Sequence, residues 1–430
     1  MAEVKAFKAM MYNETLKGGL PDLVTPPYDI IPPKAQAGYY EKNDKNVIRL
    51  EYGVILDGDN ELENRYTRAK KTLDEWLAEN TLVQGNEDAY YIYEQVFTVN
   101  GETKAFKGIF SRVRIEEFSK RVVLPHEETL SKAKTDRFSL MCETNCNFSP
   151  IYLLYLDEGK NVVSVIDENS KGKPDISFVS EDGIIQNIWI VTDKNQISAI
   201  ENGFQDKQLF IADGHHRYET ALNYRNKMRD EHPDWSENDG FNFVMSFLVE
   251  MDNDGLLVFP THRMLKNLSD FSETDMVEKL KDEFIIEKIS DTDIERGIYD
   301  PDNKVFGFYT GKDYYYKITL KDCDAMSKYL PEKSSYYRNL DVSVLHTMIL
   351  EKYFGIDKEN MANQTNLFYT RSYNEAIDSV VSGEYQCSFI INATKIREIK
   401  DVALSKEKMP QKSTYFWPKL VTGIVMNKLD

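Results

Sequence analysis

Cysteine, net positive charge and long apolar runs are all scarce in this sequence. Its four cysteines include no Cys-x-x-Cys pair, which argues against a disulfide framework and against a zinc knuckle. Lysine and arginine number 53 against 71 aspartates and glutamates, which gives a formal net charge of −18. Non-specific binding to nucleic acid or to an anionic membrane depends on clustered positive charge, so the composition argues against both partners.

Segments that would cross or enter a membrane are lacking as well. No apolar run is long enough to span a bilayer. The first residues, MAEVKAFKAMMYNETLKGG, lack the apolar centre of a signal peptide. Of the 430 residues 41% are hydrophobic, which is ample for packed cores in two or more domains. We therefore expect a reduced, cytoplasmic protein, and the sequence leaves open whether it forms a homo-oligomer.

The order of helix and strand patterns predicts a mixed α/β fold. A hairpin is expected over residues 89–115, because alternating apolar residues flank the turn-forming dipeptide Asn100-Gly101. A second hairpin is expected over residues 243–265. Beyond it, helix and strand patterns alternate anew. The sequence therefore predicts an N-terminal lobe, residues 1–267, with a β-rich insertion, and a C-terminal α/β lobe, residues 268–430.

The stretch LFIADGHHRYETAL gathers ionisable groups where a strand pattern gives way to a helix pattern. The first N–H groups of a helix have no partner within it and, with the helix dipole, they attract anions. Gly214 would let a ligand approach the backbone closely, and Arg217 with His215 and His216 would contact phosphate oxygens. Asp213 would hold Mg²⁺ or accept a hydroxyl proton.

A purely structural explanation of this stretch is equally open. Asp213 would serve as a plain N-cap of the helix, and the two histidines as half-buried polar residues. Adjacent helix residues point about 100° apart, so we do not expect His215 and His216 to bind one metal ion together.

Three more clusters carry chemistry-bearing side chains. In LPHEETLSKAKTDRFSLM they are His126, Glu127 and Arg137; at a strand end they are His262 and Arg263; in MPQKSTYFWPKLVTG they are Lys412, Ser413 and Lys419. The first cluster is typical of an acid–base loop and the others of phosphate contacts. The alternative for the His126 cluster is a solvated charged loop. The alternative for the Lys412 cluster is a C-terminal strand that packs its aromatic side chains into the core. The glycines of a P-loop are missing before Lys412, so that motif is rejected.

Seven motifs, in order across nearly the whole chain, resemble the domain of unknown function 1015 family. They are TPPYD, PHEETLSKAKTDRFSL, NFSPIYLLY, IADGHHRYETAL, GLLVFPTHRML, LDVSVLH and MPQKSTYFWPKLVTG. Their length and order make the resemblance specific. It implies a shared fold and leaves the function open, because the family name assigns none.

A shorter resemblance covers only ADGHHRYETA, which is similar to the phosphate-binding turn of the ParB/sulfiredoxin superfamily. Free serine kinases of that superfamily carry the same Asp-Gly-His-His-Arg. His215 stands where sulfiredoxins have their cysteine, which removes thiol chemistry. The resemblance implies that Asp213 is the catalytic or metal-positioning carboxylate and that the next four residues face nucleotide phosphates. The N-terminal glutamate that these kinases use as a base has no matching motif here, and Asp29 and Glu51 are its candidates.

Together these observations predict a nucleotide-dependent phosphotransferase that uses ATP or ADP and Mg²⁺ and acts on a small hydroxyl metabolite, with serine the leading acceptor. The expected catalytic residues are Asp213, His215, His126 and Glu127, with Asp213 also the expected metal ligand. The expected nucleotide contacts are Gly214, His216, Arg217, Arg137, His262, Arg263, Lys412, Ser413 and Lys419. A phosphatase or nucleotide hydrolase, and a non-catalytic nucleotide-binding regulator, would use the same anion site.

Overall fold

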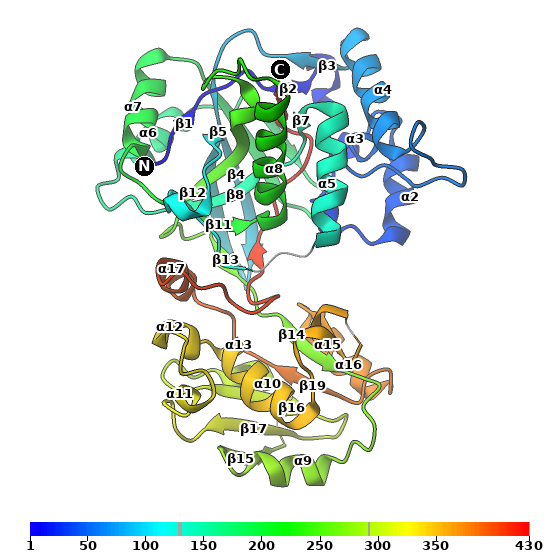
Figure 1. Cartoon of the computed structure of the whole chain (residues 1–430), viewed down its shortest axis with the longest axis vertical. Coiled ribbons are helices and arrows are strands. Elements are labelled where there is room, and N and C mark those ends of the chain that lie inside the picture. Colours follow the sequence, from blue (N-terminus) through cyan, green and yellow to red (C-terminus); the bar gives the residue numbers. More distant parts are fainter. Residues whose placement is uncertain (128–130, 291–292, 364, 430) are drawn as a thin grey trace. The chain divides into compact units, whose positions relative to one another are not determined.

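The computed structural model describes residues 1–127, 131–290, 293–363 and 365–429, and it divides the chain into two compact units (Figure 1). Unit 1 comprises Met1–Pro125, Thr129–Leu257 and Pro418–Asp430, whereas unit 2 comprises His126–Glu128 and Val258–Trp417. Unit 2 is therefore inserted into unit 1, and residues 418–430 return to unit 1 after it. The mixed α/β fold predicted from the sequence is confirmed.

In the described part of the chain, unit 1 is built on a nine-stranded mixed sheet of order β6-β11-β8-β12-β5-β4-β10-β9, with β1 paired to β5. Strand β11 is parallel to β6 and antiparallel to β8, whereas β8 is parallel to β12. One apolar cluster joins the sheet to helices α6, α7 and α8, with Ile211, Phe204 and Tyr218 among its members. Strand β11 therefore lies in the core, and its carboxyl end opens directly into α8.

The described strands and helices of unit 1 have the following bounds. The strands are β1 Val4–Lys5, β2 Met10–Tyr12, β3 Leu82–Gln84, β4 Tyr90–Val99, β5 Glu102–Arg114, β6 Val123–Leu124, β7 Cys146–Asn147, β8 Ile151–Tyr155, β9 Ile176–Val179, β10 Ile185–Val191, β11 Leu209–Asp213, β12 Phe243–Glu250 and β21 Asn427–Lys428, while β13 Leu257–Val258 crosses the boundary. The α-helices are α1 Leu20–Leu23, α2 Pro33–Lys42, α3 Ile48–Glu51, α4 Arg65–Ala78, α5 Ser131–Thr144, α6 Asn161–Asn169, α7 Lys194–Phe204 and α8 His215–Glu231.

Unit 2 holds a six-stranded antiparallel sheet of order β15-β17-β16-β19-β14-β18 among its described residues. Its strands are β14 His262–Leu265, β15 Phe284–Ile289, β16 Val305–Tyr309, β17 Tyr315–Leu320, β18 Leu367–Thr370 and β19 Cys387–Ile390, with the short β20 Phe416–Trp417 outside the sheet. Its helices are α9 Glu273–Leu280, α10 Ile294–Ile298, α11 Met326–Tyr329, α12 Ser335–Arg338, α13 Asp341–Val344, the π-helix η5 Leu345–Glu351, α14 Lys352–Phe354, α15 Lys358–Asn363, α16 Tyr373–Val381 and α17 Ile396–Leu404.

Each face of this second sheet has its own apolar cluster. Leu265 packs with residues of α13 and η5 on one face, whereas Met264 packs with residues of α10 and α16 on the other. Along the described ranges, no helix is both long and apolar enough to cross a membrane.

The hairpin at Asn100-Gly101 is confirmed, since β4 and β5 pair directly and both turn residues have positive φ. The second expected hairpin is wrong. Strand β12 pairs on its two sides with β5 and β8, so it has no edge left for residues 256–265. Strand β14 instead pairs with β18 and β19, and the two compact units divide at Leu257–Val258.

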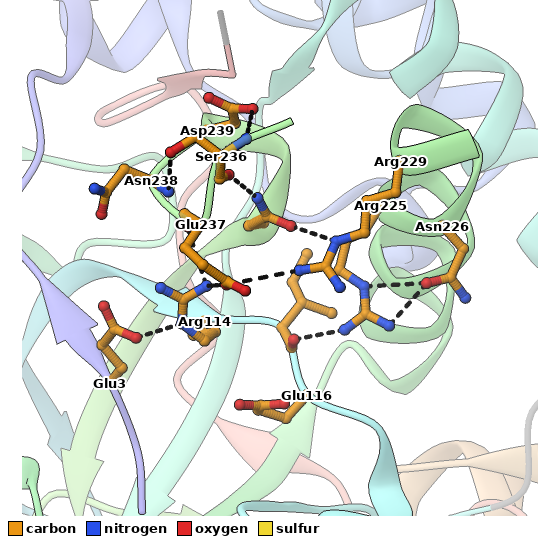
Figure 2. A network of polar contacts seen from close by, with 12 residues as sticks. Glu3, Arg114, Glu116, Arg225, Asn226, Arg229, Ser236, Glu237, Asn238 and Asp239 are labelled. Atoms are coloured by element: carbon orange, nitrogen blue, oxygen red, sulfur yellow. Dashed lines mark hydrogen bonds and ion pairs between the residues drawn. The ribbon is translucent and has the colours of Figure 1, made fainter. Parts of the chain in front are cut away.

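Two arginines fix the C-terminal half of α8 (Figure 2). Arg225 is buried and donates to the carbonyl of Ile115, which follows β5. Arg229 donates to the Asn242 side chain, which precedes β12, and its guanidinium lies 3.9 Å from the ring centroid of Trp235. These contacts set the direction of the helix, and with it the position of the turn at its other end.

Candidate functional site

The turn between β11 and α8 is a sharp strand-to-helix junction. Strand β11 ends at Asp213, and Gly214 adopts a left-handed conformation, φ 91° and ψ 26°, as the N-cap of α8. Gly214 offers no side chain to cap the helix, so the alternative that made Asp213 a plain N-cap is wrong. The dipole of the 17-residue helix therefore points its positive end at the turn, an arrangement that favours an anion.

The Asp213 carboxylate lies between two cations. Its Oδ2 is 3.0 Å from Nη2 of Arg217, and its Oδ1 is 3.2 Å from Nζ of Lys419. Burial by itself would raise the pKa of this carboxyl, but the charges of Lys419 and Arg217 lower the pKa to about 2. Asp213 therefore stays ionised throughout the neutral range, and the site contains two positive charges with one negative charge between them.

The Arg217 guanidinium folds back over the turn. Its Nη1 donates to the carbonyl of Pro150 at 2.5 Å, and a Cβ placed on Gly214 would lie 3.1 Å from its Nε. The glycine is thus required twice, for its positive φ and for the space that Arg217 occupies.

Gly214→Ala should therefore displace Arg217 as well as strain the backbone. The left-handed conformation alone costs a non-glycine residue about 1–2 kcal/mol in free energy of unfolding. Gly101→Ala is a matched control, because Gly101 has φ 79° and a Cβ there would meet nothing within 4 Å. We expect similar losses of stability in urea titrations of both variants and a loss of nucleotide affinity in Gly214→Ala alone. Equal affinities would show that the Arg217 position does not matter.

A second charged network adjoins the turn in unit 1. Arg137 on α5 is buried and donates through Nη1 to the Glu51 carbonyl at 2.8 Å, and the same nitrogen is 3.4 Å from Glu51 Oε1. Its guanidinium also binds the Asp136 carboxylate and lies 4.0 Å from the ring centroid of Tyr28. These contacts hold Arg137 in the protein interior, so its donors are engaged by the protein itself.

Glu51 is a buried carboxylate beside a small cavity. Burial raises the pKa of Glu51, while Arg137 and a 2.7 Å hydrogen bond from the Ser149 hydroxyl oppose the rise. Glu51, Arg137, Ser149 and Arg217 all line a cavity of about 40 Å³, which has room for a water molecule. Asp29, the other candidate for the N-terminal base, is exposed.

The C-terminal segment 418–430 places Lys419 in this network. Thr25 and Thr422 exchange backbone hydrogen bonds, and the Gln95 side chain donates to the Lys419 carbonyl at 3.1 Å. The motif MPQKSTYFWPKLVTG is therefore divided, because Lys419 belongs to unit 1 whereas Lys412 and Ser413 belong to unit 2. Because Lys412, Ser413 and Lys419 are close in the chain, the sequence predicted that their side chains lie together.

Within unit 2 the His126-Glu127 cluster lies beside the cluster that contains Lys412 and Ser413. The His126 ring Nε2 is 3.1 Å from the Thr414 hydroxyl, which also donates to Glu127 at 3.3 Å. Ser413 is buried four residues after Met409, whose N–H donates to the His126 carbonyl, and Lys412 is exposed. Thr414 was not among the residues singled out from the sequence, although it directly follows Lys412-Ser413.

His262 and Arg263 occupy opposite faces of β14, as neighbouring strand residues do. His262 Nε2 is 3.6 Å from Glu295 of α10, whereas Arg263 Nε is 3.4 Å from the His346 ring of η5. Both side chains are fully buried. Their side chains therefore contact different elements of unit 2, and their expected roles stay predictions. In unit 1, His215 is buried and His216 is half-buried at the start of α8.

Comparison with protein-family models matches residues 4–343 to the family described as "Protein of unknown function (DUF1015)". The chain belongs to this family. The matched span includes every strand of unit 1 except β21, and the whole β11–α8 turn. The description of the family assigns no activity.

Solved structures provide distant likenesses to this DUF1015 protein. A mutant of free serine kinase in complex with AMP has 13% identity and a TM-score of 0.37, over 75% of this chain and 92% of that one. A conserved hypothetical protein from Pyrococcus furiosus has 14% identity and a TM-score of 0.34, over 75% and 95%. SbnI from Staphylococcus aureus, truncated at its C-terminus, has 11% identity and a TM-score of 0.35, over 74% and 86%. These scores are too low to transfer a property. No curated protein matches the sequence.

Proposed function

We propose that this DUF1015 protein is a nucleotide-dependent phosphotransferase that acts on a small hydroxyl metabolite. The observation that carries the proposal is the Asp213 carboxylate, held ionised between Arg217 and Lys419 at a glycine turn that opens a long helix. Phosphoryl transfer needs chiefly positioning and neutralisation of charge, and this turn offers both.

The proposed phosphate contacts are the N-terminal turn of α8 and the two cations. Gly214 allows phosphate oxygens to come near the backbone, and the helix dipole favours their charge. Arg217 and Lys419 would exchange part of their contact with Asp213 for contact with phosphate. The donor would be ATP or ADP, whose terminal phosphoryl group passes to the acceptor oxygen.

A single carboxylate at such a turn fits Mg²⁺. The ion keeps several waters and is held by one or two carboxylates together with substrate phosphates, rather than by a protein cage. In the described ranges, no group of three or more histidine, cysteine, aspartate or glutamate side chains could hold a metal, so a protein cage is not the arrangement we propose. Asp213 would hold Mg²⁺, which when bound neutralises phosphate charge.

Asp213 is poorly suited to accept the proton of the acceptor hydroxyl, because a carboxyl with a pKa of about 2 is a weak base. Glu51, whose pKa is raised, and exposed Asp29 remain the proposed candidates for that proton. Serine as the acceptor is supported by the Asp-Gly-His-His-Arg motif shared with free serine kinases. The roles expected for His215, His216, Arg137, His126, Glu127, His262, Arg263, Lys412 and Ser413 stay predictions.

Phosphorus NMR of the full chain with Mg²⁺, ATP or ADP, and a pool of amino acids tests the proposal. A new phosphomonoester signal that grows with loss of nucleotide is the expected result, and omitting serine from the pool tests the acceptor. Free phosphate alone would favour the hydrolase instead. Intact nucleotide with broadened signals would favour a regulator, and unbroadened signals would refute nucleotide binding.

Arg217→Gln should weaken nucleotide binding. Loss of a charge-assisted hydrogen bond costs about 1.5–3 kcal/mol, which is roughly a tenfold to hundredfold rise in Kd by calorimetry. Arg229→Gln is the control, because Arg229 lies near the far end of the same helix, where it contacts Asn242 and Trp235. An unchanged Kd in Arg217→Gln would remove Arg217 from the phosphate site.

A further inference from the structure

Glu51 is a buried carboxylate with one oxygen held and the other open. It ends helix α3 and is 4% exposed. The Ser149 hydroxyl donates to its Oε1 at 2.7 Å, and Nη1 of Arg137 lies 3.4 Å from the same oxygen. Among the residues that the structure describes, no hydrogen bond to Oε2 is formed, and Glu51 lines the cavity of about 40 Å³ that Arg217 also lines. A carboxylate with one anchored oxygen and one open oxygen is suited to accept a proton.

Arg137 holds Glu51 through both its backbone and its side chain. Its Nη1 donates to the Glu51 carbonyl at 2.8 Å besides facing Oε1. On the other edge of the guanidinium, Nε and Nη2 donate to Oδ2 of Asp136 at 2.8 and 2.5 Å. The ring of Tyr28, in the short 3-10 helix Tyr28–Ile30, covers one face, with its centroid 4.0 Å from Cζ. A planar group bound along its edges and on one face is fixed in orientation.

A further layer of contacts orients Asp136. Its Oδ1 accepts from the Tyr66 hydroxyl at 2.7 Å and pairs with Arg65, and both partners lie on α4. Helices α3, α4 and α5 are thereby joined by one chain of polar contacts, which lies wholly in unit 1. Supporting contacts of this kind fix the geometry of a functional side chain. The position of Arg137, and through it that of Glu51, is therefore set from α4.

The charges around Glu51 favour its ionised form over the effect of burial. Burial raises the pKa of Glu51, whereas Arg137 on α5 and Arg217 on α8 lower it. Asp136 opposes the two arginines, and Tyr28, which also faces Glu51, is neutral below its own pKa of about 12. A buried ion pair adds little net stability to a fold. The arrangement is accounted for if the charged carboxylate itself is needed.

We propose that Arg137 is a positioning residue that keeps Glu51 ionised, with Oε2 open to the cavity that Arg217 also lines. The link to catalysis rests on the proposed phosphotransferase function, whereas the hold on Glu51 does not. Arg137 thus acts through Glu51, rather than by the contact with phosphate that the sequence predicted.

The reaction step that this arrangement serves is proton removal from the acceptor hydroxyl. The acceptor oxygen forms its bond to the terminal phosphorus of ATP or ADP as its proton passes to Glu51 Oε2. The bond from that phosphorus to the bridging oxygen breaks, and the shortened nucleotide leaves with the electron pair. Glu51 then gives the proton to water.

Carbon-13 NMR titration of the full chain, labelled at the glutamate carboxyl groups and assigned with Glu51→Gln, tests the hold on Glu51. In Arg137→Gln we expect the pKa of Glu51 to rise by about 1–3 pH units, which is the effect of losing an opposite charge at close range. Ser149→Ala should raise the same pKa by less. Asp136→Asn is the matched control with the opposite sign, because it removes the charge that competes for Arg137, so the pKa of Glu51 should fall.

An unchanged pKa of Glu51 in a folded Arg137→Gln variant would overturn the proposal. Asp136→Asn keeps the guanidinium, so an unchanged or higher pKa in that variant would overturn it even if Arg137→Gln does not fold.

The pH profile of turnover separates the positioning role from a structural one. If phosphotransfer is found, Arg137→Gln should lose turnover at neutral pH, regain it as the pH rises and Glu51 ionises, and keep KM for the nucleotide nearly unchanged. A fall in kcat by the same factor at every pH, or a higher KM with an unshifted profile, would contradict the assignment. If no phosphotransfer is found, the proposed function fails, and the NMR titration still decides whether Arg137 holds Glu51.

Discussion

Asp213→Asn is expected to reduce phosphoryl transfer by roughly a thousandfold or more while the chain stays folded. The amide keeps the shape of the side chain but neither binds Mg²⁺ as a carboxylate does nor balances Arg217 and Lys419. Nucleotide affinity measured without Mg²⁺ should rise, because the variant frees both cations from an internal competitor. Tighter binding together with lost turnover is therefore the expected signature.

Asp193→Asn is the matched control for this substitution. Asp193 also ends a strand-to-helix junction in unit 1, but its side chain caps α7 by accepting from the N–H groups of Asn195 and Gln196. Asparagine caps as well as aspartate does, so this variant should keep stability and turnover. Wild-type turnover in Asp213→Asn, measured by the appearance of phosphomonoester, would show that the carboxylate has no part in the chemistry.

Deletion of residues 418–430 is expected to unfold unit 1. The segment buries Leu420, Ile424, Val425, Met426 and Leu429, each exposed by 6% or less. Burial of such side chains contributes about 1.5–3 kcal/mol each, so the loss of roughly 10 kcal/mol approaches the whole stability of a typical domain. Soluble yield and circular dichroism of the truncated chain measure the effect.

Lys419→Met separates the packing of that segment from its charge. The variant keeps the buried apolar side chains and the Gln95 contact, which is made to the backbone carbonyl. We expect a folded protein with weakened nucleotide binding, and a Kd equal to wild type would remove Lys419 from the site.

For the deletion of residues 418–430, a soluble truncated chain with a native spectrum would contradict the expected unfolding of unit 1. Restored nucleotide binding on addition of a 418–430 peptide would support it.

The parts of the fold that depend on local chemistry were predictable from the sequence. The Asn100-Gly101 turn needs two residues that tolerate positive φ, and the dipeptide signals this directly. The junction at Asp213-Gly214 is also local, because a buried strand, a glycine and a helix follow each other without interruption. The boundary expected at residue 267 stays a prediction. The pairing of β14 was not predictable, because strand pairing is not local and nothing near β14 shows that its partners are β18 and β19.

The candidate site shows the same division. Asp213 and Arg217 are four residues apart on one turn, so their ion pair follows from the motif. The pairing of Asp213 with Lys419 does not follow from the motif, because Lys419 lies in the segment that comes after unit 2 in the sequence. Arg137 was predicted to contact phosphate, but the sequence could not show that Glu51 and Asp136 would engage its guanidinium. Arg263 likewise gave no sign of being a buried charge.

The insertion of unit 2 between two parts of unit 1 sets an order of events during protein synthesis. A ribosome must translate residues 258–417 before it reaches the segment that completes unit 1. Until then the emerging chain lacks Lys419 and β21, the strand partner of β7. The apolar surface of unit 1 that residues 418–430 cover stays exposed. Domains generally fold as they emerge, but here the first unit must wait for the second. We therefore expect nascent chains to depend on chaperones, and any nucleotide chemistry to begin only after both units have been made.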